Sequence, residues 1–469
     1  MLHRMLKQKI FTFVVVVGVV GISLLFFPRP NSYADHPIAQ HQGLDGSQTQ
    51  WKQYLFSDLH QGWNPDETHL SASNIASLKQ LWSFHAIGDV AAEPVVVNGV
   101  VYEGDWNGGM YALNATTGQL IWSAQLIVNA TSGCGIYRRG VSGAAIVDSG
   151  VVYVGSGNVY YALNASDGSI IWQKTLGSTG TESDTLYGSA AIGNGKIYVG
   201  ISSLCDKPNT PGMLYALNTS DGSIAAQFTT VPNGDIGGSV WGAPTVDAAT
   251  GTVLITTGQV LYGKIKHDLY NDALIQLDWN TLAVKQSWQV PLTQQSHETD
   301  FGCAPTLFPG PSGATYVGCI NKNSIYYVFD ESNLGAGPVW EVPLGPGGDK
   351  GGITGSMASA SYANGVLYIE TALATVNGTS YAGSVGAFNA LTGQQLWRVG
   401  IAGSISATVI LANGLLYDTQ GKTLEVRDMN TGNILYSHTF PGPLKGSVTV
   451  CNGIVYIPSF DFHLYAYTA

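Results

Sequence analysis

Five residues spread along the chain are of the kinds that bind ligands or transfer protons. They comprise two cations, an indole ring, an amide and a carboxylate: Arg139, Trp241, Gln259, Asp300 and Lys322. A carboxylate can accept a proton from a substrate, and an indole offers a flat surface to a flat ligand. Because these residues are far apart in the sequence, only the fold can bring them together.

The elements that must position them are repeats. The unit is clearest as VVYEGDWNGGMYALNATTGQLIW, Val100–Trp122, and it returns at Val151–Trp172, Lys196–Ile224, Leu367–Trp397 and Leu415–Tyr436. Each copy predicts four strands. Asn-Gly or Ser-Gly joins the first two strands, a turn typical of hairpins because both residues tolerate positive φ. The third strand carries Tyr-Ala-Leu or its equivalent, and the fourth ends at Trp.

The number of fourth strands predicts the architecture. Eight candidates occur, at Trp82, Trp122, Trp172, Gln227–Phe228, Trp288, Trp340, Trp397 and Tyr436. The chain then ends with three more strands in Ser447–Tyr467, and Leu81–His85 supplies the missing fourth. We therefore expect an all-β, eight-bladed β-propeller of four-stranded antiparallel blades, closed by pairing the N-terminal strand with the C-terminal blade. The recurring Trp residues are expected to pack between blades.

In such a ring, the loops that join fourth to first strands share one face with those that join second to third strands. All five residues of the opening paragraph fall in or beside these loops. The topology therefore predicts that they surround one mouth of the propeller.

The composition favours β-strands joined by tight turns and argues against nucleic acid as a partner. The chain has 59 Gly, only 11% charged residues and a net charge of −11. Tight turns and pleated strands suit this mix. Because no Lys/Arg cluster occurs in the repeats, nucleic acid is not expected as a partner.

The N-terminus has the layout of an export signal. Cationic residues precede an apolar run at 10–27, and Ser32-Tyr33-Ala34 offers a cleavage site. We interpret 1–34 as a signal peptide, or as a retained anchor through 10–27, and 35–50 as a flexible linker. The propeller is then 51–469, and it is expected to be secreted, periplasmic or held at the cell surface.

The repeat unit and the opening Asn64-Pro-x-Glu-Thr-x-Leu resemble pyrroloquinoline-quinone (PQQ) dehydrogenase propellers, and the polyvinyl-alcohol dehydrogenase type most closely. The resemblance implies PQQ and Ca²⁺ as cofactors. It implies that Arg139 and Lys322 contact the quinone, that Trp241 stacks on it, and that Asp300 is the catalytic base beside Ca²⁺. Gln259 stands where these enzymes have an Asn ligand to the metal.

The chain also departs from this family. The vicinal cysteine pair that closes over the quinone is reduced to Cys134, because position 133 is Gly. Glu93, in the Glu-x-x-Pro region of the first repeat, is displaced by two positions. No Cys-x-x-Cys-His is present, so no covalently attached haem is expected.

Cysteines of an exported chain invite disulfides. Cys303 and Cys319 each lie eight residues from Pro311, the expected centre of a hairpin loop, so they are predicted to oppose each other and form a disulfide. Cys134 and Cys205, in loops of adjacent repeats, are the second predicted pair. Cys451 is expected to be a buried free thiol.

Two function classes follow. The first is a PQQ-dependent alcohol dehydrogenase that oxidises secondary or polymeric alcohols and passes electrons to a separate acceptor. The second is a non-catalytic propeller scaffold that binds protein or polysaccharide at the cell envelope, since the same repeat occurs in outer-membrane assembly lipoproteins.

Overall fold

The structure is a computed structural model that describes residues 49–129, 140–178, 184–203, 210–234, 236–260, 268–295, 299–348, 355–403 and 407–469. The predicted signal or anchor, 1–34, and all but the end of the linker lie outside these residues. Within them, no helix is long and apolar enough to cross a membrane. The helices described are short 3₁₀ turns: η2 (Ile75–Ser77), η3 (Leu292–Gln294), η4 (Pro311–Gly313) and η5 (Glu331–Ala336).

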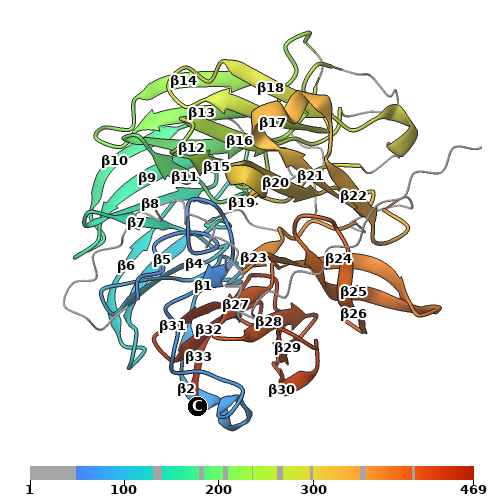
Figure 1. Cartoon of the computed structure of the whole chain (residues 1–469). Coiled ribbons are helices and arrows are strands. Elements are labelled where there is room, and N and C mark those ends of the chain that lie inside the picture. Colours follow the sequence, from blue (N-terminus) through green and yellow to red (C-terminus); the bar gives the residue numbers. More distant parts are fainter. Residues whose placement is uncertain are drawn as a thin grey trace, which may run out of the picture. The chain divides into compact units, whose positions relative to one another are not determined.

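The described strands form eight sheets arranged as the blades of a propeller (Figure 1). Blades 1 to 4 consist of β3–β6 (Val95–Val97, Val100–Gly104, Gly109–Asn114, Leu120–Gln125), β7–β10 (Ile146–Asp148, Val151–Ser156, Val159–Asn164, Ile170–Thr175), β11–β14 (Ala191–Gly193, Lys196–Ile201, Met213–Asn218, Ile224–Thr229) and β15–β18 (Thr245–Asp247, Thr252–Thr256, Ala273–Asp278, Val284–Gln289). Blades 5 to 7 consist of β19–β22 (Thr306–Pro309, Thr315–Ile320, Ile325–Asp330, Trp340–Pro343), β23–β26 (Ser361–Ala363, Val366–Val376, Thr379–Asn389, Gln395–Ile401) and β27–β30 (Ile410–Ala412, Leu415–Gln420, Thr423–Asp428, Ile434–Thr439).

Blade 8 closes the ring as predicted. It combines β31 (Thr449–Cys451), β32 (Ile454–Ser459) and β33 (His463–Thr468) with β2 (Lys79–His85) from the start of the chain. β2 pairs antiparallel with β33, from Lys79 opposite Thr468 to His85 opposite His463. The C-terminus therefore lies beside β2 (Figure 1), and the eight-bladed fold and its closure are confirmed.

The hairpin turns have the backbone that their sequence predicts. Both turn residues adopt positive φ at Asn98-Gly99 (53° and 73°) and at Asn413-Gly414 (45° and 79°), and the other Asn-Gly and Ser-Gly turns agree. Two consecutive positive φ values define the turn that matches the right-handed strand twist. The turn residues thus set where each first strand ends and each second strand begins.

The recurring Trp residues join neighbouring blades, as expected. In five of them the indole N–H donates to a backbone carbonyl of the next blade at 2.8–3.1 Å: Trp82 to Ala115, Trp122 to Ala165, Trp172 to Thr219, Trp340 to Ala390 and Trp397 to Met429. The ring lies against a glycine of the same turn. A Cβ at Gly168, for example, would come within 2.5 Å of Trp122. The docking Trp and the turn Gly are therefore one packing unit.

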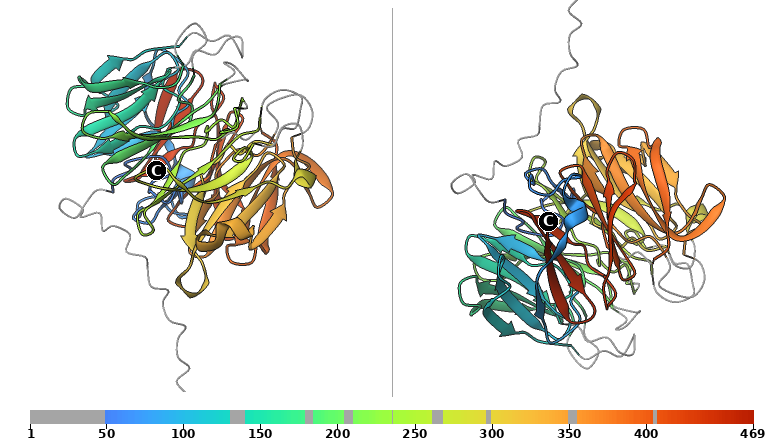
Figure 2. Two further views of the ribbon diagram at one scale, coloured as in Figure 1. Left: turned by 90° about the horizontal axis from the view of Figure 1, so that it is seen from above. Right: turned by 90° about the horizontal axis from the view of Figure 1, so that it is seen from below.

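Residues 49–64 run along the inner strands of most blades. Backbone or side-chain hydrogen bonds join this segment to blades 1, 2, 4, 5, 6, 7 and 8, through Val96, Val147, Thr245, Leu307, Tyr362, Leu411 and Val450. Its last residues form β1 (Trp63–Asn64), which pairs parallel with β27. The segment reaches seven blades that are distant in sequence, so it ties the ring together from within. Figure 2 shows it (blue) among the blades from above and below.

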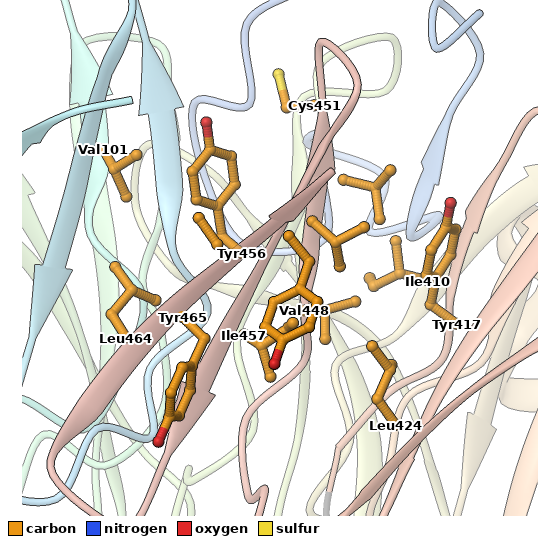
Figure 3. Packing of buried hydrophobic residues seen from close by; sticks show 14 of the residues in the cluster. Val101, Ile410, Tyr417, Leu424, Val448, Cys451, Tyr456, Ile457, Leu464 and Tyr465 are labelled. Carbon is orange, nitrogen blue, oxygen red and sulfur yellow. The ribbon is translucent and has the colours of Figure 1, made fainter. Parts of the chain in front are cut away.

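The largest packed cluster spans blades 7, 8 and 1 (Figure 3). It includes Tyr456, Leu464 and Val101 and extends to Cys451. Cys451 is buried and free, as predicted, and its thiol donates to the Thr49 carbonyl at 3.2 Å. Burial raises the pKa of this thiol to about 12.

The predicted Cys303–Cys319 disulfide is not formed, and both cysteines are buried free thiols. The 3₁₀ turn η4 moves the centre of the hairpin from Pro311 to Ser312, since Pro309 pairs with Thr315. Farther along the hairpin Phe301 bridges to Asn321, a register in which Cys303 lies opposite Cys319 as predicted, yet both remain thiols. The Cys303 thiol donates to the Ile320 carbonyl at 3.2 Å.

Candidate active site

Four of the predicted site residues come from neighbouring loops of blades 4 and 5. Trp241 precedes β15 and Gln259 follows β16, whereas Asp300 precedes β19 and Lys322 follows β20. These are the loops that the propeller topology assigns to one face. The contacts described below join all four residues.

Asp300 is the centre of this group. Its Oδ2 lies 2.8 Å from Nζ of Lys322, and its Oδ1 accepts the backbone N–H of Gln259 at 2.6 Å. The backbone N–H of Lys322 also donates to the Asp300 carbonyl, at 2.9 Å. The side chains of Asp300 and Lys322 are 17% and 11% exposed, so the pair is largely buried but not fully withdrawn from solvent.

Trp241 lies beside this ion pair. Nζ of Lys322 is 5.1 Å from the centre of the indole ring, within the range of a cation–π interaction. The ring fits against Gly302, where a Cβ would come within 2.2 Å of Cη2. A side chain at position 302 would displace the indole, so a glycine here defines the orientation of Trp241.

Asp272 is a site residue that the sequence did not reveal. It is 2% exposed, and among the described residues its Oδ1 has no hydrogen-bond partner. Burial and the nearby Asp300 raise its pKa well above the ordinary value. Asp272 ends the second-to-third-strand loop of blade 4, directly before β17, so the shared-face argument would have included it. Its residue type alone gave no signal, because Asp is common at strand ends.

Other predicted residues are elsewhere or not described. Arg139, Cys134 and Cys205 lie outside the described residues. Glu93 is buried and does not belong to this group. Its Oε1 accepts the indole N–H of Trp51 at 2.8 Å and the backbone N–H of Leu55 at 2.7 Å, and burial raises its pKa to about 8.

The described residues do not fit a calcium centre. None of them form a group of three or more His, Cys, Asp and Glu side chains able to hold a metal ion. Ca²⁺ takes about six to eight oxygen ligands. Asp300, predicted as a ligand together with Gln259, has the Lys322 ammonium on one oxygen and a backbone N–H on the other.

The same residues do fit a flat anionic quinone. Trp241 supplies an aromatic surface backed by Gly302, and Lys322 supplies a cation beside it. Asp300 adds a carboxylate that could accept a proton from a substrate placed next to such a ligand. The arrangement therefore combines a binding platform with a candidate base.

The fold belongs to a known family. A family model described as "Outer membrane protein assembly factor BamB" matches residues 66–297 and 381–469, so the chain belongs to this family of PQQ-type propellers. It is also 25% identical over 331 residues to a polyvinylalcohol dehydrogenase of a Pseudomonas species, which covers 62% of this chain and 50% of that protein. The chain spans about half the length of the curated relatives it matches.

Solved structures share the fold. The quinohemoprotein alcohol dehydrogenase of Comamonas testosteroni superposes with a TM-score of 0.73 at 17% identity, covering 89% of this chain and 80% of that chain. BamB of Moraxella catarrhalis superposes with a TM-score of 0.59 at 17% identity, covering 84% and 100%. Both catalytic and assembly proteins thus use this architecture.

Proposed function

We propose that this protein is a PQQ-dependent alcohol dehydrogenase whose site is the group formed by Asp300, Lys322 and Trp241. The observation that carries the proposal is the contact chain from the Asp300 carboxylate through the Lys322 ammonium to the Trp241 ring. The polyvinylalcohol dehydrogenase relatives support secondary or polymeric alcohols as the substrate class.

Each residue has a distinct task in this proposal. Trp241 holds the plane of the quinone, and Lys322 binds its oxygens while orienting Asp300. Asp300 takes the proton of the substrate hydroxyl. PQQ, when bound, supplies the two-electron oxidation. In this proposal the electrons then leave to a separate acceptor.

Titration of the purified protein with PQQ, with and without Ca²⁺, tests this proposal. We expect saturable binding seen as a change in the quinone absorption, followed by dye reduction with secondary alcohols. The run without Ca²⁺ shows whether the Lys322 site binds the quinone unaided. No absorption change under either condition would overturn the proposal.

A binding scaffold is the second candidate function. It is favoured by the family match to an assembly factor and by the poor fit of the described residues to calcium. A scaffold would bind protein or polysaccharide through its loop face and would not respond to PQQ. Pull-down of an envelope component by a protein that fails the titration would favour this function.

We also propose that the protein is exported. The support is the cationic start, the apolar run at 10–27 and the cleavage site at 32–34. Cell fractionation and N-terminal sequencing of the mature protein would test this. An uncleaved protein in the cytoplasm would contradict export, whereas an uncleaved membrane-bound form would indicate an anchor.

A further inference from the structure

Blade 6 carries a longer hairpin than the other blades do in their described strands. Its second and third strands, β24 and β25, have 11 residues each, whereas the second and third strands of the other blades have 5 or 6. Residues 372–383 form the extension, the arm, which Figure 1 shows projecting from blade 6 (orange). Because the arm joins a second strand to a third, it belongs to the face that carries Lys322.

The base of the arm is in contact with the loop that contains Lys322. The Ala372 N–H donates to Oγ of Ser356 at 3.1 Å, and this oxygen lies 3.3 Å from Oγ of Ser324, in the same loop as Lys322. The residue before Ser356 is also close, since a Cβ at Gly355 would come within 2.7 Å of Cβ of Lys322. The arm therefore continues outward from the candidate site.

The arm is uncharged and rich in hydroxyl groups. No Asp, Glu, Lys or Arg occurs from 371 to 397, although the chain as a whole has a net charge of −11. The exposed hydroxyl side chains of the arm are Thr375, Thr379, Ser380 and Tyr381. An ionic ligand finds no opposite charge on these residues, whereas a neutral ligand with many hydroxyl groups finds both donors and acceptors.

Tyr381 gives the arm an aromatic surface. Its ring lies on Gly400 of β26, where a Cβ would come within 2.2 Å of Cδ2, yet Tyr381 remains 37% exposed. Leu373, which is 39% exposed, adds apolar surface on the other strand of the arm. A ring held against a glycine is fixed in orientation, as Trp241 is on Gly302, and presents carbon surface to a ligand.

The edge of the arm does not suit an added protein strand. β24 pairs with β23 only through Val366, Leu367 and Tyr368, so among the described strands none pairs with the inner edge of its later part. Leu373 interrupts this edge with a φ of 52°. An added strand needs a regular row of N–H and C=O groups. A flexible polymer does not, and the kinked edge therefore favours a polymer over a polypeptide.

We propose that the arm is a subsite for a neutral polymeric alcohol, which it holds so that one part of the polymer enters the mouth beside Asp300. The subsite rests on the dehydrogenase function proposed above and extends it. The ring of Tyr381 packs against the carbon chain of the polymer, and the hydroxyl side chains of the arm bind its hydroxyl groups. A small secondary alcohol at Asp300 does not reach the arm, so the arm favours polymers over small substrates.

Electrophoresis of the full protein, without PQQ, in native gels that contain poly(vinyl alcohol) tests the subsite. We expect the polymer to retard the wild type and Tyr381→Ala to raise the dissociation constant at least roughly fivefold. Tyr381→Phe keeps the ring and should bind nearly as the wild type does. Phe462→Ala is the matched control, because Phe462 is 40% exposed on the second-to-third-strand turn of blade 8.

Leu373→Asn is a second test that does not depend on Tyr381. Asn tolerates the positive φ of this position, so the variant loses apolar surface without new backbone strain. We expect weaker retardation by the polymer. A wild type that the polymer does not retard would overturn the subsite. So would Tyr381→Ala and Leu373→Asn variants that both bind like the wild type, or equal retardation of the wild type by neutral dextran.

Kinetics separate the subsite from the dehydrogenase function. With PQQ bound, Tyr381→Ala should raise KM for poly(vinyl alcohol) at least roughly fivefold more than KM for 2-butanol, with kcat for 2-butanol retained. Equal changes in the two KM values would count against the subsite. If no alcohol is oxidised but polymer binding still depends on Tyr381, the dehydrogenase function fails and the subsite stands.

Discussion

Lys322 connects the other predicted site residues that the structure describes. Its ammonium forms a direct ion pair with Asp300 and lies over the ring of Trp241. An ion pair that is largely withdrawn from water is screened less than one on the surface. Because one cation serves both partners, a change in either side chain should alter the position of Lys322 and thus the geometry of the whole site.

Asp300→Asn should abolish alcohol oxidation and leave the fold intact. The amide keeps the size of the side chain and can still accept the Gln259 N–H, but it cannot take a proton. We expect the rate with a secondary alcohol to fall at least about 100-fold. Steady-state kinetics measure the loss, and thermal melting tests the fold. Asp66→Asn, on the surface, is the control. An active Asp300→Asn variant would remove Asp300 from the mechanism.

Trp241→Ala should weaken quinone binding. The change removes the flat surface and the partner of the Lys322 ammonium, and stacking of this kind is worth about 1 kcal/mol beyond burial. We expect the dissociation constant of PQQ, measured by equilibrium dialysis, to rise roughly tenfold. Trp241→Phe keeps an aromatic face and should bind nearly as the wild type does. Equal binding by the Ala variant would place the quinone elsewhere.

At the scale of the elements, Gly168→Ala should destabilise the contact between blades 1 and 2. Gly168 has φ of +73°, and a Cβ there would come within 2.5 Å of Trp122. Gly195 has φ of +69° with open space around it, so Gly195→Ala isolates the cost of the backbone conformation. We expect that control to cost about 1 kcal/mol and Gly168→Ala a further ~1–3 kcal/mol. Denaturant unfolding gives both values, and equal losses would show that the Trp–Gly contact contributes nothing.

At the scale of the whole molecule, Glu93 couples the inner segment to the ring. It receives hydrogen bonds from Trp51 and Leu55, which belong to the segment that contacts seven blades. Burial raises the pKa of Glu93 from 4.5 to about 8, and burial raises that of Glu331 to about 7. In the unfolded chain both acids ionise near their ordinary values, so the folded state binds more protons between these limits. The protein should therefore lose stability as the pH rises from mildly acidic to about 8.

Glu93→Gln should reduce this pH dependence. The amide oxygen can still accept both hydrogen bonds, and no charge can form. The free energy of unfolding should match the wild type near pH 5 and exceed it near pH 8, because each pKa unit of difference is worth about 1.4 kcal/mol. Chemical denaturation at a series of pH values measures the effect, with Glu341→Gln as the control. Parallel curves for Glu93→Gln and the wild type would contradict it.

The site was predictable in part. Trp241, Asp300 and Lys322 could be brought together because the position of a loop in a propeller unit decides its face. Asp272 was missed because an aspartate at a strand start gives no sign of its burial. The resemblance placed Glu93 near a position that binds the cofactor in related proteins. In the structure Glu93 instead accepts the indole N–H of Trp51, and no local sequence pattern predicts this contact between distant segments. Cys303 and Cys319 are opposed as the sequence predicts, but both remain thiols, and the Cys303 sulfur is hydrogen-bonded to the Ile320 backbone.

The sequence by itself determined the blades, their number and their closure. These depend on local rules, namely positive φ at Asn-Gly turns and alternation along strands, and those rules repeat in every unit. Only the tertiary structure decided which polar groups are buried and against what. The path of residues 49–64 along the inner strands and the contact of Lys322 with Trp241 both join distant segments. Their free energies depend on burial and on pairwise distance, which exist only once the ring has closed.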